Sequence, residues 1–183
     1  MHLDDLPDSV YRAAITLMGH ALTPSINVPI TAIGSVFLDP SNSDRRKLIK
    51  EAVFRGLMFT DQSIRHQASY CVNLILQIET DEWSELLPSL FEVANSSTSQ
   101  YSIEAHCGVI YCYKIIIQSS APFEFLGDSL ENFYFLITHF LLGSDISSEI
   151  LYDECFDCFI SILDRMEGAS KIDNDIAIKC FEI

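Results

Sequence analysis

The sequence predicts an all-α protein, an α-solenoid in which about four helical hairpins stack as a right-handed superhelix. Three observations lead to this fold. Apolar residues recur with the helical period along almost the whole chain, and the helical segments are joined by short polar turns. Helices of the same kind begin near residues 43, 83 and 129, a spacing of 40 to 46 residues. One hairpin cannot bury its apolar face alone, so its neighbours must stack on it.

Composition sets limits on function. The chain has 183 residues, of which 49% are hydrophobic, and it is expected to fold as one domain over residues 1–183. Its formal net charge of -15 argues against nucleic acid as a partner, because phosphate binding depends on clustered Lys and Arg. No apolar run approaches the roughly 18 residues that a membrane span needs. Membrane insertion is therefore not expected.

The first helix is predicted at residues 6–22, where Pro7 suits the first turn. Its apolar stripe at i, i+4, i+7 and i+11 consists of Val10, Ala14, Leu17 and Ala21. Residues 26–38 contain Pro29 and Gly34, which predict a short helix or an irregular connector.

The next helix, residues 43–59, begins with a basic cluster. The cluster consists of Arg45, Arg46, Lys47 and Lys50, with Arg55 further along. It either binds an anionic partner or is a solvated helix start. Basic residues at a helix N-terminus oppose the helix dipole, which favours an acidic neighbour or partner. The expected buried residues are Leu48, Ala52 or Val53, and Leu57.

The stretch from residue 63 to residue 90 is interpreted as the joint between two stacked hairpins. A helix capped by Asp61 runs to about Glu79, and a second helix opens at Trp83, the only tryptophan. The inward residues of these two helices are Ala68, Cys71 or Val72, Ile75 and Ile78, then Leu86, Leu87, Leu90 and Phe91. The opposite side of the first helix is polar with little charge, as on a helix that faces a partner; it carries His66, Tyr70, Asn73 and Gln77. Trp83 is expected to anchor the joint.

Four further helical segments are expected after the joint. They cover residues 101–118, 129–142, 147–166 and 175–183, with a loop at 119–123. The apolar run at 109–117 has strand propensity, but its length favours a helix. The last segment reads as an unfinished helix, so the natural chain is expected to continue past Ile183 as part of a longer solenoid.

No catalytic or metal-binding pattern emerges. Cys155 and Cys158 form a CxxC, which can be redox-active or bind zinc, but they fall on the apolar stripe of their helix. The five histidines have no metal-ligand spacing, and no phosphate loop or nucleophile motif occurs. We therefore expect no enzymatic activity and no cofactor, with free thiols in a reducing compartment.

The helix spacing matches two-helix repeats of the HEAT or armadillo type. Within them, residues 75–79 (ILQIE) followed by 83–88 (WSELLP) resemble the I-A-x-I-E and W-P-E-L-x-P joint near the amino end of importin-β. Residues 37–50 are similar to the W-L-x-x and R-x-x-I/V-K segment of that family, and residues 10–23 to its R-x-A-A and K-N-x-L-T helix. Gly19 and His20 stand where the family has Lys-Asn, and the family's first hairpin has no counterpart.

The resemblance implies a monomeric nuclear transport receptor in the cytoplasm, the nucleus and the pores of the nuclear envelope. Its implied partners are the Ran GTPase in its GTP form, phenylalanine-glycine nucleoporins, and import cargo or an importin-α adaptor. In the family, Ran contacts come from the second helices of the first repeats. The matching positions here are Arg12, His20, His66, Tyr70 and Asn73. Nucleoporin peptides would need an apolar slot near Phe91 or Phe133. A generic HEAT or armadillo scaffold remains the alternative.

Overall fold

A computed structural model describes residues 7–23, 37, 39–78, 83–119, 123–142 and 148–168, and these residues contain helices and turns but no strand. The described elements are α1 (Asp8–Leu22), the 3-10 turn η2 (Pro40–Asn42), α3 (Ser43–Gly56), α4 (Gln62–Ile78), α5 (Leu86–Ala94), α6 (Ile103–Gln118), α7 (Phe123–Leu126), α8 (Ser129–Leu142) and α9 (Glu149–Gly168). The all-α prediction is confirmed, and the arrangement is compatible with an α-solenoid.

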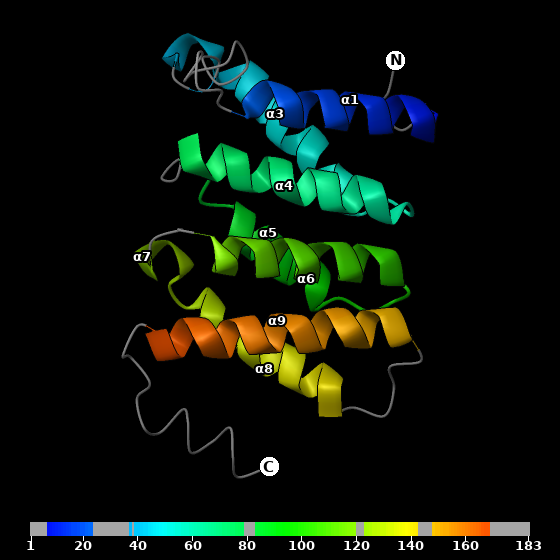
Figure 1. Ribbon diagram of the computed structural model, residues 1–183, viewed down its shortest axis with the longest axis vertical. Helices are drawn as coiled ribbons and strands as arrows, with labels where there is room; N and C mark the ends of the chain where they lie inside the picture. The colour runs from blue at the N-terminus through cyan, green and yellow to red at the C-terminus, as the bar shows by residue number, and fades with distance from the viewer. Residues whose placement is uncertain are drawn as a thin grey trace.

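The helices lie in two layers. In one layer, α1 contacts α4, α4 contacts α6 and α6 contacts α9, and these helices lie side by side and run in the same direction (Figure 1). In the other layer lie α3, α5 and α8, and α5 contacts α8 (Figure 1). Each helix of this second layer also packs on the next long helix in the chain, as α3 on α4, α5 on α6 and α8 on α9. The core is therefore sandwiched between the layers.

Two hydrogen bonds between side chains fix how α9 lies along α6. Lys114 bonds to Asp157 and Gln118 bonds to Ser161, and both pairs are separated by 43 residues. Equal separations at successive positions mean that α6 and α9 are parallel along their contact. Because these bonds join polar side chains at the edge of the core, they set the register without occupying its apolar interior.

The predicted joint between hairpins is well packed. Ala68, Cys71, Val72 and Ile75 of α4 are fully buried, as their stripe predicts. Trp83 is only 4% exposed and receives the Lys50 ammonium of α3 at 5.4 Å from its ring centroid. Trp83 is thus buried beside α3 at the turn before α5, as its predicted role as an anchor requires. However, α5 begins at Leu86, and Trp83 precedes it in a turn.

The predicted inward stripe of α1 is wrong. Val10 is 47% exposed and Leu17 is 67% exposed, whereas Tyr11, Ile15 and Leu22 are buried. The helix carries two adjacent apolar stripes, and periodicity alone does not rank them. The neighbouring α4 selects the stripe that contains Tyr11 and Ile15, because these larger side chains fill the space against it.

The buried side of α3 is predicted in part. Val53 and Leu57 are fully buried, but Leu48 is 62% exposed, so its predicted burial is wrong. A short helix, α7, begins at Phe123, the last residue of the expected loop, and covers residues for which no element was predicted. It is followed by Gly127, whose φ of 44° lies in the left-handed region that glycine tolerates. Apart from Phe37, the expected connector at residues 26–38 lies outside the described residues, as does the expected helix at 175–183.

Candidate partner-binding surface

The first helical layer carries the predicted partner-binding residues. His66, Tyr70 and Asn73 follow one another at i, i+4 and i+7 on α4, so they share one side of that helix. Arg12 and His20 are both exposed on the neighbouring α1. The structure therefore places all these residues on two contacting helices of the same layer, as an extended surface rather than a cleft.

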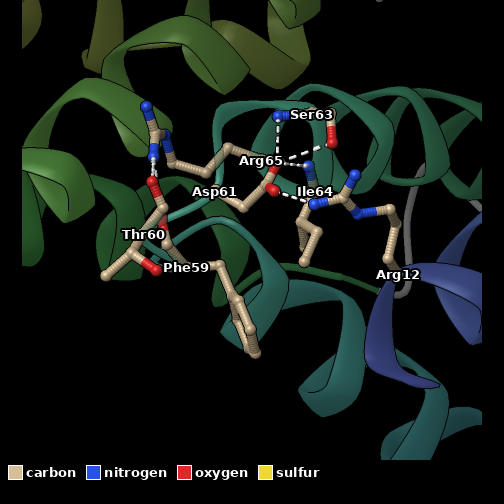
Figure 2. A network of polar contacts seen from close by, with 7 residues as sticks. All are labelled: Arg12, Phe59, Thr60, Asp61, Ser63, Ile64 and Arg65. Carbon is tan, nitrogen blue, oxygen red and sulfur yellow. Dashed lines mark hydrogen bonds and ion pairs between the residues drawn. The ribbon is translucent and has the colours of Figure 1, made fainter. Parts of the chain in front are cut away.

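The turn that leads into α4 is organised by Asp61 (Figure 2). Its carboxylate accepts hydrogen bonds from the backbone N–H of Ser63 at 2.8 Å, from the Ser63 hydroxyl at 2.6 Å and from the backbone N–H of Ile64 at 3.4 Å. These bonds, led by that of the Ser63 hydroxyl, hold the pKa of Asp61 below its usual range. Asp61 thus caps α4 as the sequence predicts.

Arg12 reaches from α1 to the Asp61 carboxylate and forms an ion pair with it (Figure 2). The predicted partner contact therefore already has a role within the chain, because it ties α1 to the start of α4. The side chain is still about half exposed. An incoming partner would have to share or displace the Asp61 carboxylate to use Arg12.

Arg65 points away from Asp61 and closes the same turn from inside (Figure 2). It is buried, and its Nη1 donates hydrogen bonds to the carbonyl oxygens of Phe59 at 2.8 Å and Thr60 at 2.7 Å. These carbonyls follow the end of α3, where they have no helical partner. Arg65 therefore fixes the connection between α3 and α4 and gives the surface a rigid base.

His66 is half-buried and lies flat against Tyr111 of α6, with ring centroids 4.0 Å apart and an angle of 15° between the rings. Burial lowers the pKa of His66 from its ordinary value of 6.5, and the positive charges of Arg65 and Lys114 act in the same direction. The negative charge of Glu154 opposes this shift in pKa without cancelling it. His66 is therefore held in its neutral form over a wider pH range than a free histidine.

The remaining predicted contact residues, Tyr70, Asn73 and His20, differ in their exposure and in their hydrogen bonds. Tyr70 is 42% exposed, and its hydroxyl lies 3.2 Å from the Thr23 hydroxyl at the end of α1. Asn73 is half-buried, and its Oδ1 has no hydrogen-bond partner among the described residues. Leaving a buried amide oxygen unpaired costs folding free energy. His20 is exposed, and it is not brought into the group formed by the α4 residues.

Sequence reasoning missed a charged cluster that continues the surface onto α6 and α9. Lys114 donates to the Glu154 carboxylate at 3.2 Å and to the Asp157 carboxylate at 3.1 Å, and its Nζ lies 4.7 Å from the centroid of the Tyr111 ring. Burial alone would lower the pKa of Lys114, but the bonds to Asp157 and Glu154 outweigh burial and raise it. The sequence contains one indication of this cluster, because Lys114 interrupts the apolar run of α6. A lysine that is buried in such a run needs acidic partners.

The CxxC of α9 lies in the core. Cys155 and Cys158 are fully buried, as the core interpretation predicts. Burial raises the pKa of Cys155 to about 12 and raises that of Cys158 as well, so neither is a thiolate near neutral pH. Within the described ranges no group of His, Cys, Asp and Glu side chains has the geometry of a metal site, and no helix is long and apolar enough to cross a membrane.

The His66 environment predicts a pH effect on stability. Above pH 6.5 the histidine is neutral in both the folded and the unfolded chain, so its contribution is fully present. As the pH falls through 6.5 the unfolded chain takes up a proton more readily than the folded one, so this contribution is lost. His66→Phe keeps a ring against Tyr111 but cannot titrate. We expect its free energy of unfolding, measured with urea between about pH 7.5 and pH 5, to fall less than that of the wild type. If the free energy of unfolding depended on pH in the same way in His66→Phe and in the wild type, the lowered pKa of His66 would be contradicted.

Comparison with protein-family models, with curated proteins and with solved structures found no match.

Proposed function

We propose that this chain is a protein-binding scaffold of HEAT type that acts as part of a nuclear transport receptor of the importin-β kind. The sequence motifs at residues 10–23, 37–50 and 75–88 are the basis of the proposal. The two layers of stacked helices support it, because a HEAT scaffold requires each hairpin to bury its apolar face against the next. The hydrogen bonds of Lys114 to Asp157 and of Gln118 to Ser161 make α6 and α9 parallel neighbours, as the second helices of successive repeats would be.

Ran in its GTP form is the proposed partner for the surface on α1, α4 and α6. The observation that favours this surface is the side of α4 that carries His66, Tyr70 and the half-buried Asn73. Among them Tyr70 is an exposed aromatic side chain, the residue type that most often dominates binding at protein interfaces. His66 and Tyr111 extend the surface as a stacked pair that loses little side-chain entropy on binding.

Phenylalanine-glycine nucleoporins are the proposed partners for the other layer. A groove of about 620 Å³ lies between α5 and α8, and Leu87, Phe91 and Phe125 are among its lining residues. This position matches the apolar slot expected near Phe91. Phe133 is fully buried beneath it and is not available to a ligand. A phenylalanine ring fits the apolar lining, whereas import cargo or an importin-α adaptor would need a larger surface.

Binding of Ran tests the proposal. We expect the whole chain to bind Ran loaded with a non-hydrolysable GTP analogue more tightly than Ran loaded with GDP, measured by biolayer interferometry. Tyr70→Ala should weaken this binding by about tenfold, in the range of an interfacial tyrosine. The matched control is Tyr152→Ala, which removes a similarly exposed tyrosine from α9 outside the predicted contacts.

Three results would count against the Ran proposal: equal binding to both nucleotide forms, no binding to either, or equal effects of the two tyrosine variants. Circular dichroism melting of both variants separates loss of binding from loss of fold. The outcome also decides between this proposal and a general helical scaffold, which has no reason to distinguish GTP from GDP.

A further inference from the structure

Large apolar side chains are exposed mainly at the two ends of the stacked helices. Ten of them are exposed among the described residues, and nine belong to α1 and α3 or to α8 and α9; the exception is Tyr70 of α4. Figure 1 places these two pairs of helices at opposite ends of the stack, which we call the α1–α3 end and the α8–α9 end. The terminal units of a helical stack need a polar outer face to stay soluble. Apolar ends therefore indicate surfaces that another protein covers.

The helix α1 has its exposed apolar stripe on the side opposite α4. Gly19 faces α4, because a Cβ atom there would lie 2.2 Å from Nε2 of Gln67. Leu17, two positions earlier, is turned by about 200° around the helix axis. It is 67% exposed. The α1 stripe has members at i, i+4, i+7 and i+11, which are Val10, Ala14, Leu17 and Ala21.

The helix α9 has a stripe of the same spacing on the side opposite α6. Glu154 faces α6, because it accepts a hydrogen bond from Lys114 at 3.2 Å. Phe156, two positions further, lies on the opposite side of α9 and is 50% exposed. The α9 stripe consists of Tyr152, Phe156, Phe159 and Leu163. Its members are all bulky, whereas the α1 stripe alternates larger side chains with alanine, so the ridge of one stripe fits the gaps of the other.

The second layer is also apolar at its two ends. Leu48 of α3 is 62% exposed, and Phe135 of α8 is 52% exposed. Leu48 lies two positions before Lys50, whose ammonium lies over the Trp83 ring in the turn that precedes α5. Phe135 lies two positions after Phe133, whose ring meets an aromatic ring of α5. Both exposed side chains are therefore on the sides of α3 and α8 that face away from α5.

The charges around these side chains favour contact between unlike ends. The α8–α9 end is acidic, because exposed carboxylates lie one turn from its apolar side chains; they are Glu131, Glu149 and Asp153. The only acid of α1 is Asp8. Around Leu48, two acids and two bases balance each other; they are Asp44, Glu51, Arg45 and Arg55. Two α8–α9 ends would therefore repel each other, whereas the α1–α3 end has no comparable excess of acids.

We propose that the chain associates with itself head to tail, with the α9 stripe of one copy packed on the α1 stripe of the next and Phe135 near Leu48. The helices α1, α4, α6 and α9 run in the same direction and each packs on the next, so this contact continues the first layer into the next copy (Figure 1). One heterologous interface then covers the apolar side chains of both ends. The resemblance to importin-β implies a monomer instead. Ran has no part in the contact, so this proposal and the Ran proposal can fail separately.

The test follows the average molar mass of the whole chain by sedimentation equilibrium as its concentration is raised. The mass should rise steadily from that of one chain, because each added copy leaves a free end. Leu17→Glu and Phe156→Glu each place a carboxylate in the contact and should weaken the association by at least about tenfold. The control is Gln100→Glu, which adds the same charge at an exposed position between α5 and α6 and should associate as the wild type does. All three positions are exposed, so the variants should fold, which circular dichroism checks.

Mixing the two interface variants shows which ends meet. Leu17→Glu keeps an intact α8–α9 end, and Phe156→Glu keeps an intact α1–α3 end. An equimolar mixture should therefore form a dimer with one copy of each variant and grow no further. Any of four results would overturn the proposal: a wild-type mass of one chain at every concentration, association of either interface variant alone as strong as that of the wild type, a mixture that stays monomeric, or an equal loss of association in Gln100→Glu.

Discussion

Replacement of Gly108 by alanine is expected to lower the free energy of unfolding by about 3 kcal/mol or more, the upper range for overpacking. A Cβ atom at Gly108 of α6 would lie 1.7 Å from the carbonyl oxygen of Leu57 and 2.8 Å from Cδ of Arg65. The obstacle is backbone, which cannot rotate away as a side chain can. It also lies in the connection that Arg65 holds through the carbonyls of Phe59 and Thr60.

Gly19→Ala is the matched control for Gly108→Ala. Gly19 is also helical, but the atom closest to its added Cβ is Nε2 of Gln67, at the far end of a flexible side chain. Alanine also gains up to about 1 kcal/mol over glycine in helix propensity. The free energy of unfolding of Gly19→Ala, measured with urea, should therefore stay within about 1 kcal/mol of the wild type. Equal losses in the two variants would contradict the close approach of α6 to the connection between α3 and α4.

The second large effect is expected for Phe133→Ala, with a loss of about 3–5 kcal/mol of unfolding free energy. Phe133 of α8 is fully buried, and its ring stacks on Tyr113 of α6 with centroids 3.7 Å apart. It also meets the edge of Phe91 of α5 at 5.6 Å. Truncation would leave a cavity where three helices from both layers meet, and the loss of the two ring contacts adds to its cost.

Phe135→Ala controls for the loss of a phenylalanine from the same helix. Phe135 is 52% exposed and should lose no more than about 1 kcal/mol, as expected for a surface position. Urea unfolding of both variants measures the difference. A Phe133 variant as stable as the Phe135 variant would place Phe133 outside the core. Since Phe91 lines the groove between α5 and α8, loss of Phe133 should also weaken any peptide bound there.

Two features keep the helices at fixed distances from one another and therefore affect function. One is the connection between α3 and α4 that Arg65 holds, and the other is the packing of α5, α6 and α8 around Phe133. Each proposed binding surface is built from side chains on different helices, so it depends on the spacing between helices. Gly108 and Arg65 set the spacing of α6 from the connection between α3 and α4. Phe133 sets the spacing of α8 from α5 and α6. Variants at these positions are therefore expected to weaken binding even though they touch no partner.

Most helices could be predicted from the sequence, because helical periodicity and capping are local. The predicted stripe of α4, the Asp61 cap and the anchoring Trp83 all agree with the structure. The short helix α7 was missed because four residues are too few to show a period.

From the amino-acid pattern alone one can predict that the described residues are helical, where most helices lie, and that the polar side of α4 carries His66, Tyr70 and Asn73. The packing of the helices was needed to learn which of two adjacent stripes α1 buries, and that Lys114 of α6 meets Glu154 and Asp157 of α9. The periodicity of a helix records that one side is apolar, but burial and ion pairing are set by the neighbours that pack against it. Those neighbours lie some 40 residues away in the chain, as the 43-residue separation of Lys114 and Asp157 illustrates.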